Sequence, residues 1–265
     1  MKQQHRARIK VTSRSFSRHP VLKQELLDIF PNSVFNKDGP PTGLANIVEF
    51  LNDADGMILG LEQMDRQVLQ QLNNLKIIAK YGVGLDNLDV KAAEKLGIAV
   101  GWGGGVNKRS ASEQALGFML GLSRNLFFSS FPLKNGIWEK EGGSFLTGKA
   151  VGIIGCGHIG SDLIYLLQPL NCRILICDIL DKSGVVDTYG ATQVSQEELL
   201  TDADMISLHV PLTELTQGMV NENFLQKMKP TAYLINNSRG PVVNQKALKN
   251  ALQEKIIAGA ALDVF

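Results

Sequence analysis

The stretch AVGIIGCGHIGSDL, residues 150–163, decides the fold of this chain of 265 residues. Its first residues form an apolar run that predicts a buried strand, and its last residues begin a pattern typical of an amphipathic helix. Between them stands G-x-G-x-x-G, a motif that indicates dinucleotide binding when it joins a strand to a helix. Gly155 permits the tight turn, Gly157 lets the backbone approach a pyrophosphate, and Gly160 lets the helix pack closely on the strand.

We therefore expect a bound cofactor to contact the loop residues Gly155, Gly157, His158, Ile159 and Gly160. The free N–H groups and the positive end of the following helix favour phosphate groups at this point. His158 could instead act as a catalytic base, but a side chain at its position faces the phosphates, so a phosphate contact is the expectation. A tight strand–helix turn that binds no ligand is the alternative for the whole motif.

The next expected strand, residues 173–177, ends in Asp178, eighteen residues beyond Gly160. An acidic residue at about this distance binds the adenosine ribose hydroxyls in dinucleotide-binding folds. Its charge would repel a 2′-phosphate, and the two residues that follow it offer no compensating arginine. The expected cofactor is therefore NAD rather than NADP, with Asp181 as a competing candidate for the same role.

On both sides of the motif, short β-branched runs alternate with amphipathic stretches, the pattern of parallel strands joined by crossover helices. The best boundary follows the glycine-rich residues 101–105, so we expect an α/β protein of two doubly wound parallel-sheet domains, 1–108 and 109–265. Strands are expected at 8–12, 56–60, 75–80, 98–100, 150–154, 173–177, 205–209, 232–236 and 256–263. Helices are expected at 21–30, 64–72, 90–96, 110–126, 159–170, 196–203, 223–228 and 244–254. A loop that contains several aromatic residues is expected at 127–148.

Composition excludes several classes of protein. Hydrophobic residues make up 44% and charged residues 20% of the chain, and the formal net charge is +1, so we expect a globular protein with neither nucleic acid nor membrane as partner. No apolar run reaches the roughly 18 residues of a membrane span, and no apolar segment of a secretory signal follows the basic N-terminus. Three cysteines cannot make a full disulfide framework, which favours a reducing, cytoplasmic location. No metal site is expected.

Five more segments stand in a fixed order around the glycine motif. They are YGVGLDNLD (81–89), NKRSASE (107–113), HVPLT (209–213), LINNSRG (234–240) and IAGAALDVF (257–265). Together with residues 151–160 they resemble the D-isomer-specific 2-hydroxyacid dehydrogenases, and within them the D-3-phosphoglycerate dehydrogenase group. The resemblance spans nearly the whole chain from about Leu75 onward.

The resemblance implies an NAD-dependent oxidoreductase that interconverts a D-2-hydroxy acid, with 3-phosphoglycerate as one candidate, and its 2-oxo acid by hydride transfer. It implies a flavodoxin-like substrate domain and a Rossmann-like NAD domain. It also implies that the backbone at Val83 and Gly84 contacts the substrate carboxylate, and an exposed turn with free N–H groups suits a carboxylate on physical grounds too; a plain turn is the alternative. Further cofactor contacts are implied for His209, Val210 and Pro211 around the adenine, for Asn237 and Ser238, and for Asp263 near the nicotinamide.

Arg239 is the candidate catalytic residue. It follows an apolar strand at the carboxyl edge of the expected sheet, where open α/β folds bind ligands. Its planar guanidinium can engage a 2-oxo acid through both the carboxylate and the carbonyl oxygen, and the family uses the matching arginine in this way. A surface salt bridge is the alternative.

The chain departs from the family pattern in one respect. The family moves a proton with a His in a Pro-His-x-x-Gly segment supported by a Glu, and none of His5, His19, His158 and His209 matches that position before the sequence stops at Phe265. We therefore expect a fragment or a shortened relative that binds NADH but turns over slowly, unless His209 supplies the proton. The alternative function is a catalytically weak, NAD(H)-sensing binding module of the corepressor type.

A homodimer is also expected. The helix at 110–126 and the arm that follows it resemble the dimer-forming element of the family. The apolar residues Phe127, Phe128, Phe131 and Trp138 of this arm would be costly to expose in a monomer.

Overall fold

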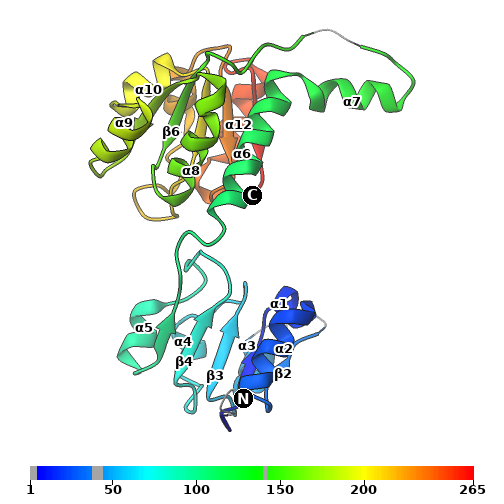
Figure 1. Cartoon of the computed structure of the whole chain (residues 1–265), viewed down its shortest axis with the longest axis vertical. Coiled ribbons are helices and arrows are strands. Elements are labelled where there is room, and N and C mark those ends of the chain that lie inside the picture. The colour runs from blue at the N-terminus through cyan, green and yellow to red at the C-terminus, as the bar shows by residue number, and fades with distance from the viewer. Residues whose placement is uncertain (1–4, 38–43, 140–141) are drawn as a thin grey trace. The chain divides into compact units, whose positions relative to one another are not determined.

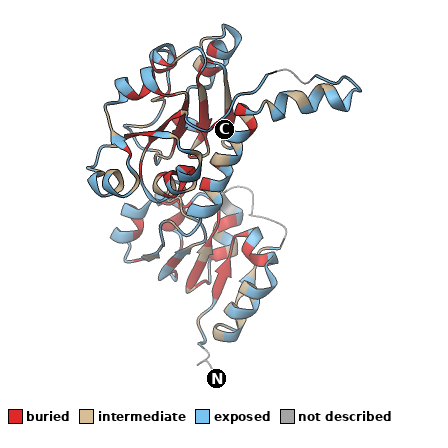
Figure 2. Ribbon diagram, turned by 45° about the horizontal axis from the view of Figure 1, so that its top comes forward, coloured by how far each residue is buried: buried red, intermediate tan, exposed pale blue. Residues whose placement is uncertain are grey.

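The computed structural model describes residues 5–37, 44–139 and 142–265. Its contacts divide the chain into two compact units, residues 1–106 (unit 1) and 107–265 (unit 2). Each unit is a parallel sheet flanked by helices (Figure 1). In both units the buried residues concentrate on the strands and on the helix faces turned towards them (Figure 2).

The strands of unit 1 run parallel in the order β2-β1-β3-β4-β5. This is the flavodoxin-like order, in which the chain reverses direction across the sheet between its first and third strands. Leu59, Met57 and Ile78 of the central strands are buried in one apolar cluster with helix residues such as Leu69. The elements are β1 (Ile9–Val11), α1 (Arg14–Arg18), α2 (Pro20–Ile29), β2 (Val34–Phe35), α3 (Leu44–Leu51), β3 (Gly56–Leu59), α4 (Arg66–Leu69), β4 (Ile77–Lys80), α5 (Val90–Lys95) and β5 (Ala99–Gly101).

The strands of unit 2 run parallel in the order β11-β10-β9-β6-β7-β8. Counted from β6, this is the strand order of the dinucleotide-binding fold, and the chain reverses direction across the sheet between β6 and β9. The predicted fold class is thus confirmed. The strands are β6 (Ala150–Ile154), β7 (Arg173–Cys177), β8 (Thr192–Gln193), β9 (Met205–Leu208), β10 (Tyr233–Asn236) and β11 (Gly259–Leu262).

Helices cover both faces of the unit 2 sheet, and the alternation of side chains along β6 divides the core between them. Val151 and Ile153 pack in the cluster that contains α6 and α8, while Ile154 packs in the cluster that contains α10, α11 and α12. A Cβ on Gly152 would lie 2.6 Å from Leu199 Cδ2, so α10 approaches the strand too closely for a side chain. The helices are α6 (Lys108–Ser123), α7 (Leu126–Lys134), α8 (His158–Leu167), α9 (Ser183–Tyr189), α10 (Gln196–Asp202), α11 (Glu222–Lys227) and α12 (Gln245–Gln253), with short 3₁₀ turns η1 (Gln168–Leu170) and η2 (Gly240–Val242).

The main local error of the sequence-based prediction concerns residues 127–148. The structure places helix α7 at their start, where a loop was predicted. No residue of α7 is buried, so this helix has no apolar stripe against a core to reveal it. The elements α1, α3, α9, β2 and β8 were not predicted either. Of these, α1, β2 and β8 span at most five residues, too few to show a period.

In the part of the chain that the structure describes, none of the helices is both long and apolar enough to cross a bilayer.

Candidate functional site

The three glycines of the loop between β6 and α8 have different surroundings. Gly155 has a φ of +89°, and a Cβ there would lie 2.7 Å from the carbonyl oxygen of His209. A Cβ on Gly160 would lie 2.5 Å from the carbonyl oxygen of Gly155, because α8 passes directly over the loop. A Cβ on Gly157 would meet no atom within 4 Å. The loop is therefore packed tightly on two sides and open at Gly157.

An open pocket of about 490 Å³ lies beside Gly157 and His158. At its edge Asp162 Oδ1 accepts a hydrogen bond from Arg109 Nη2 at 3.0 Å, and Arg109 Nε forms an ion pair with Asp162 Oδ2 at 2.9 Å. The Ser112 hydroxyl donates to the same carboxylate. Burial alone would raise the pKa of Asp162, but these hydrogen bonds outweigh it and hold the pKa below its ordinary value. The ionised carboxylate thus fixes Arg109 next to the open side of the loop.

Asp178 follows β7 and is bonded to the glycine loop. Its Oδ2 accepts a hydrogen bond from the Cys156 N–H at 2.7 Å, and its Oδ1 accepts one from the Leu180 N–H at 2.8 Å. The Lys182 ammonium lies 3.4 Å from Oδ2. Burial raises the pKa of Asp178, but the two N–H groups and Lys182 lower it by more, so the carboxyl remains ionised at neutral pH.

The competing candidate, Asp181, has a different environment. It is exposed, and its carboxylate accepts hydrogen bonds from the N–H and the hydroxyl of Ser183 at the start of α9. The side chain therefore orders the start of a helix and has no bond to the glycine loop. The geometry favours Asp178 as the acidic partner of that loop.

The loop after β9 packs against the glycine loop. The backbone at His209 and the Val210 side chain both lie where a Cβ on Gly155 would stand, and Pro211 follows at the exposed side. The Ser207 hydroxyl is 2.9 Å from Nε2 of His209. Burial lowers the pKa of His209 to about 4, so the imidazole is neutral at pH 7. A neutral imidazole is a poor proton donor, which argues against His209 as the general acid.

Buried Asn236 shapes the loop after β10. Its Oδ1 accepts hydrogen bonds from the N–H and the hydroxyl of Ser238, at 3.0 and 2.7 Å, and its Nδ2 donates to the Arg239 carbonyl oxygen at 2.9 Å. This Asx-type turn sets the direction in which Arg239 leaves the sheet. The guanidinium Nη1 donates to the Ser238 carbonyl oxygen at 2.7 Å.

Two contacts join the loops after β10 and β11 to helix α6. Asn237 Nδ2 donates to the Ala111 carbonyl oxygen at 2.7 Å, and Gln114 Nε2 donates to Asp263 Oδ1 at 2.7 Å. The Oδ1 atom of Asn237 is buried and accepts no hydrogen bond from the described residues. A buried amide oxygen without a donor is costly, so this atom marks a place where a ligand N–H would be favoured.

In unit 1, the turn after β4 holds the residues predicted to bind a carboxylate. Gly82 has a φ of +132°, and the Val83 carbonyl oxygen accepts a hydrogen bond from Trp102 Nε1 at 2.9 Å. Within the described part of the chain, the N–H groups of Val83 and Gly84 donate to no protein acceptor. The Lys80 side chain, beside this turn, donates instead to Asn87 Oδ1 at 2.7 Å and to the Gly60 carbonyl. The turn thus presents free N–H donors. Lys80 links the loop that contains Gly60 to the loop that contains Asn87.

The predicted site residues of unit 2 gather at one edge of its sheet. The glycine loop, Asp178 and residues 209–211 follow the adjacent strands β6, β7 and β9, and residues 237–239 and Asp263 follow the next strands β10 and β11. This is the carboxyl edge, and it includes the point where the strand order reverses, at which open α/β sheets bind ligands. The open cradle at Gly157 and the unpartnered Asn237 Oδ1 fit a dinucleotide. Among the described residues, no group of three or more His, Cys, Asp or Glu side chains is arranged to hold a metal ion.

Sequence reasoning missed four side chains that position the site: Asn236, Gln114, Lys182 and Asp162. Asn236 had a detectable signal, because an Asn directly after an apolar strand often forms a side-chain turn. Gln114 and Asp162 act on residues far away in the sequence, 149 and 50 positions respectively. No local pattern could have revealed those two contacts.

Comparisons with known proteins agree with this geometry. The family model of the NAD binding domain of D-isomer specific 2-hydroxyacid dehydrogenases matches residues 116–265. A glyoxylate reductase from Korarchaeum cryptofilum is 37% identical over 236 residues, which cover 86% of this chain and 71% of that protein. A D-3-phosphoglycerate dehydrogenase from Synechocystis sp. is 36% identical over 229 residues, which cover 84% of this chain and 41% of that protein.

Among solved structures, a glyoxylate reductase from Paecilomyes thermophila superposes with a TM-score of 0.83 at 26% identity, covering 100% of this chain and 82% of that one. These relatives are dehydrogenases. The alternative of an NAD(H)-sensing corepressor module receives no support from them.

The open side of the glycine loop leads to a prediction. Gly157→Val places its side chain in free space, so the midpoint of chemical denaturation should change little, whereas NADH binding should weaken at least about tenfold because the methyl groups occupy the phosphate cradle. Fluorescence titration with NADH measures the affinity. The matched variant Gly160→Val puts its side chain against the Gly155 backbone and should lose stability itself. Unchanged NADH affinity in Gly157→Val would contradict the placement of the cofactor phosphates.

Proposed function

The chain belongs to the D-isomer specific 2-hydroxyacid dehydrogenase family, and we propose how its two units divide the work of this NAD-dependent oxidoreductase. Unit 2 (residues 107–265) is the NAD-binding domain, and unit 1 (residues 1–106) binds the carboxylate of the substrate. The proposal assigns these two functions to the two domains expected from the sequence, residues 1–108 and 109–265. The observation that carries the proposal is the gathering of the glycine loop, Asp178 and Arg239 at the carboxyl edge of one sheet.

Unit 2 holds the cofactor along this edge. The N–H groups at Gly157, His158 and Ile159, at the positive end of α8, would hold the pyrophosphate. Asp178, ionised and bonded to the loop backbone, would accept hydrogen bonds from the adenosine ribose, and its charge disfavours a 2′-phosphate. His209, Val210 and Pro211 would line the adenine. NAD(H), when bound, accepts or supplies the hydride.

Residues after β10 and β11 orient the nicotinamide end. The buried Asn237 Oδ1 can accept a hydrogen bond from a carboxamide, and the Asp263 carboxylate is held by Gln114 for the same purpose. Ser238 contributes the backbone of this turn, and its N–H donates to Asn236 Oδ1, which fixes the conformation of the turn. These side chains place the reacting ring without taking part in bond changes.

Arg239 binds and polarises the 2-oxo acid. A guanidinium carries five N–H donors, so anchoring Nη1 on the Ser238 carbonyl is compatible with a bidentate contact to the carboxylate and the 2-oxo oxygen. The positive charge favours the negative charge that develops on that oxygen as hydride arrives. In unit 1, the free N–H groups of Val83 and Gly84 suit a substrate carboxylate.

The arm after α6 is proposed as a homodimer contact. Helix α7 projects away from the sheet of its unit (Figure 1), and Phe128 and Phe131 are 63% and 68% exposed. Trp138, beyond the helix, is 81% exposed. Apolar groups gathered in this way are favoured at an interface between two copies.

A cytoplasmic location is proposed because the three cysteines, Cys156, Cys172 and Cys177, are free, as is usual in a reducing compartment.

Replacement of Arg239 by lysine tests the proposed function. The point charge of an ammonium cannot reproduce the planar fork, so kcat/KM should fall at least tenfold, equivalent to about 1.4 kcal/mol. The assay uses whichever of glyoxylate, hydroxypyruvate and 3-phosphohydroxypyruvate the unmutated protein reduces fastest with NADH. Arg173→Lys, at an exposed pair with Asp202 in the same unit, is the control and should keep normal kinetics. Normal kinetics in Arg239→Lys would show that Arg239 does not bind the reacting group.

The dimer contact leads to a second prediction. Phe131→Asp places a charge in the proposed interface and should convert a dimer into a monomer in sedimentation velocity experiments. Leu215→Asp also replaces an exposed apolar residue, 80% accessible in the loop after β9, and should leave the dimer intact. A monomeric unmutated protein, or a dimer that survives Phe131→Asp, would refute this interface.

A further inference from the structure

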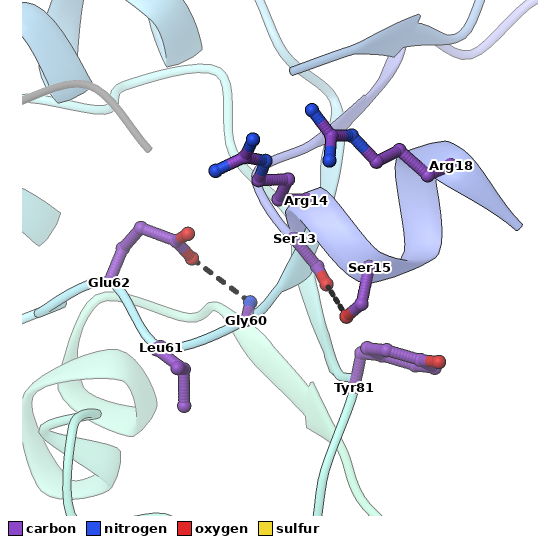
Figure 3. Close-up of a pocket in the computed structure, with 8 residues that line it drawn as sticks. All are labelled: Ser13, Arg14, Ser15, Arg18, Gly60, Leu61, Glu62 and Tyr81. Atoms are coloured by element: carbon purple, nitrogen blue, oxygen red, sulfur yellow. Dashed lines mark hydrogen bonds between the residues drawn. The ribbon is translucent and has the colours of Figure 1, made fainter. Parts of the chain in front are cut away.

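A pocket of about 650 Å³ lies in unit 1, at the carboxyl edge of its sheet. Residues that follow three adjacent strands line it: Ser13 and α1 after β1, Gly60 to Glu62 after β3, and Tyr81 after β4 (Figure 3). Parallel α/β sheets bind ligands at this edge. The pocket is therefore in the position of a binding site within this unit.

Two arginines give the pocket its charge. Arg14 and Arg18 lie one helical turn apart on α1, and both guanidinium groups reach into the same side of the pocket (Figure 3). Neither forms a hydrogen bond or an ion pair with any of the described residues. Like charges at this spacing destabilise a helix slightly. Some other cations of the unit are paired with a carboxylate, as in Arg8–Asp53 and Lys76–Asp55.

The one carboxylate in the pocket lining does not neutralise these arginines. Glu62 is buried, and its Oε2 accepts hydrogen bonds from the Thr12 hydroxyl and, at 3.0 Å, from the Gly60 N–H. It forms no ion pair with Arg14 or Arg18. Glu62 thus orders the loop after β3, and the two guanidinium groups remain available to an anion.

The far wall of the pocket is ordered and adjoins the carboxylate turn. The Tyr81 ring packs edge-on against Phe16, with ring centroids 5.2 Å apart and an interplanar angle of 88°. Val83, whose N–H is free, follows Tyr81 by two residues, so their Cα atoms lie within about 7 Å of each other. A small acid held by its carboxylate at Val83 and Gly84 can therefore extend its other end into this pocket.

We propose that Arg14 and Arg18 bind a second anionic group of the substrate, and that this dehydrogenase acts on 2-hydroxy acids carrying a phosphoryl or a second carboxylate group. The inference rests on the proposed function, because it takes the turn at Val83 and Gly84 as the site of the first carboxylate. Two guanidinium groups and the Ser15 hydroxyl supply several N–H and O–H donors for such a group. An acid without a second charge, such as lactate, would leave both arginines unpaired.

Calorimetric titration tests this subsite without turnover. The full protein is saturated with NADH, so that added 2-hydroxy acids form dead-end complexes. Two matched pairs of ligands are compared, 3-phosphoglycerate with D-glycerate and D-malate with D-lactate, because each pair differs in one anionic group. We expect the doubly anionic member of at least one pair to bind at least tenfold more tightly. The pair with the larger ratio identifies the group as phosphoryl or carboxylate.

The double variant Arg14→Gln/Arg18→Gln should abolish this preference while the affinity for the singly charged acid changes less than about twofold. Arg66→Gln, at another exposed arginine of unit 1, should preserve it. Equal affinities within both pairs, or a preference that survives the double variant, would overturn the subsite. Binding of 3-phosphoglycerate through these arginines without oxidation of any 2-hydroxy acid would support the subsite and refute the proposed function.

Discussion

The close contact between the glycine loop and the backbone at His209 is the constraint on which the rest of the cofactor site depends. Gly155 can adopt its positive φ and lie against the His209 carbonyl because it has no Cβ. That contact draws together the loops after β6 and β9, where the strand order reverses. It also lets Cys156 donate its N–H to Asp178, which brings in the loop after β7. Three loops thus meet at one point because one position lacks a side chain.

The positions of individual charged groups explain how a chain with a net charge of only +1 can bind an anionic cofactor and anionic substrates. In the proposed function the positive groups are local: the N-terminus of α8 would serve the pyrophosphate, and Arg239 the 2-oxo acid. The carboxylates near them are engaged by hydrogen bonds, Asp162 with Arg109 and Asp178 with the loop backbone. Because His209 is neutral at pH 7, it adds no charge beside the adenine.

Sequence reasoning predicted the central strands of unit 2 and missed the exposed helix α7. The strands at 150–154 and 173–177 have the bounds expected, because the packing of central strands demands continuous apolar runs. Helix α7 was taken for a loop, since an exposed arm carries no periodic apolar face. In the candidate site, the glycine loop and Asp178 could be predicted because their chemistry is local in sequence. Gln114 was missed because its partner, Asp263, is far away in the sequence. Asn236 was missed because it is buried and acts only by hydrogen bonds that hold the turn.

The central claim is that the carboxyl edge of the unit 2 sheet holds NAD through the open glycine and Asp178. The most direct measurement is a crystal structure of the protein with NADH. We expect the pyrophosphate to lie against the backbone at Gly157 and His158, and the adenosine ribose hydroxyls to lie within about 3 Å of the Asp178 carboxylate. A cofactor seated elsewhere, or a ribose bonded to Asp181 with Asp178 untouched, would contradict it.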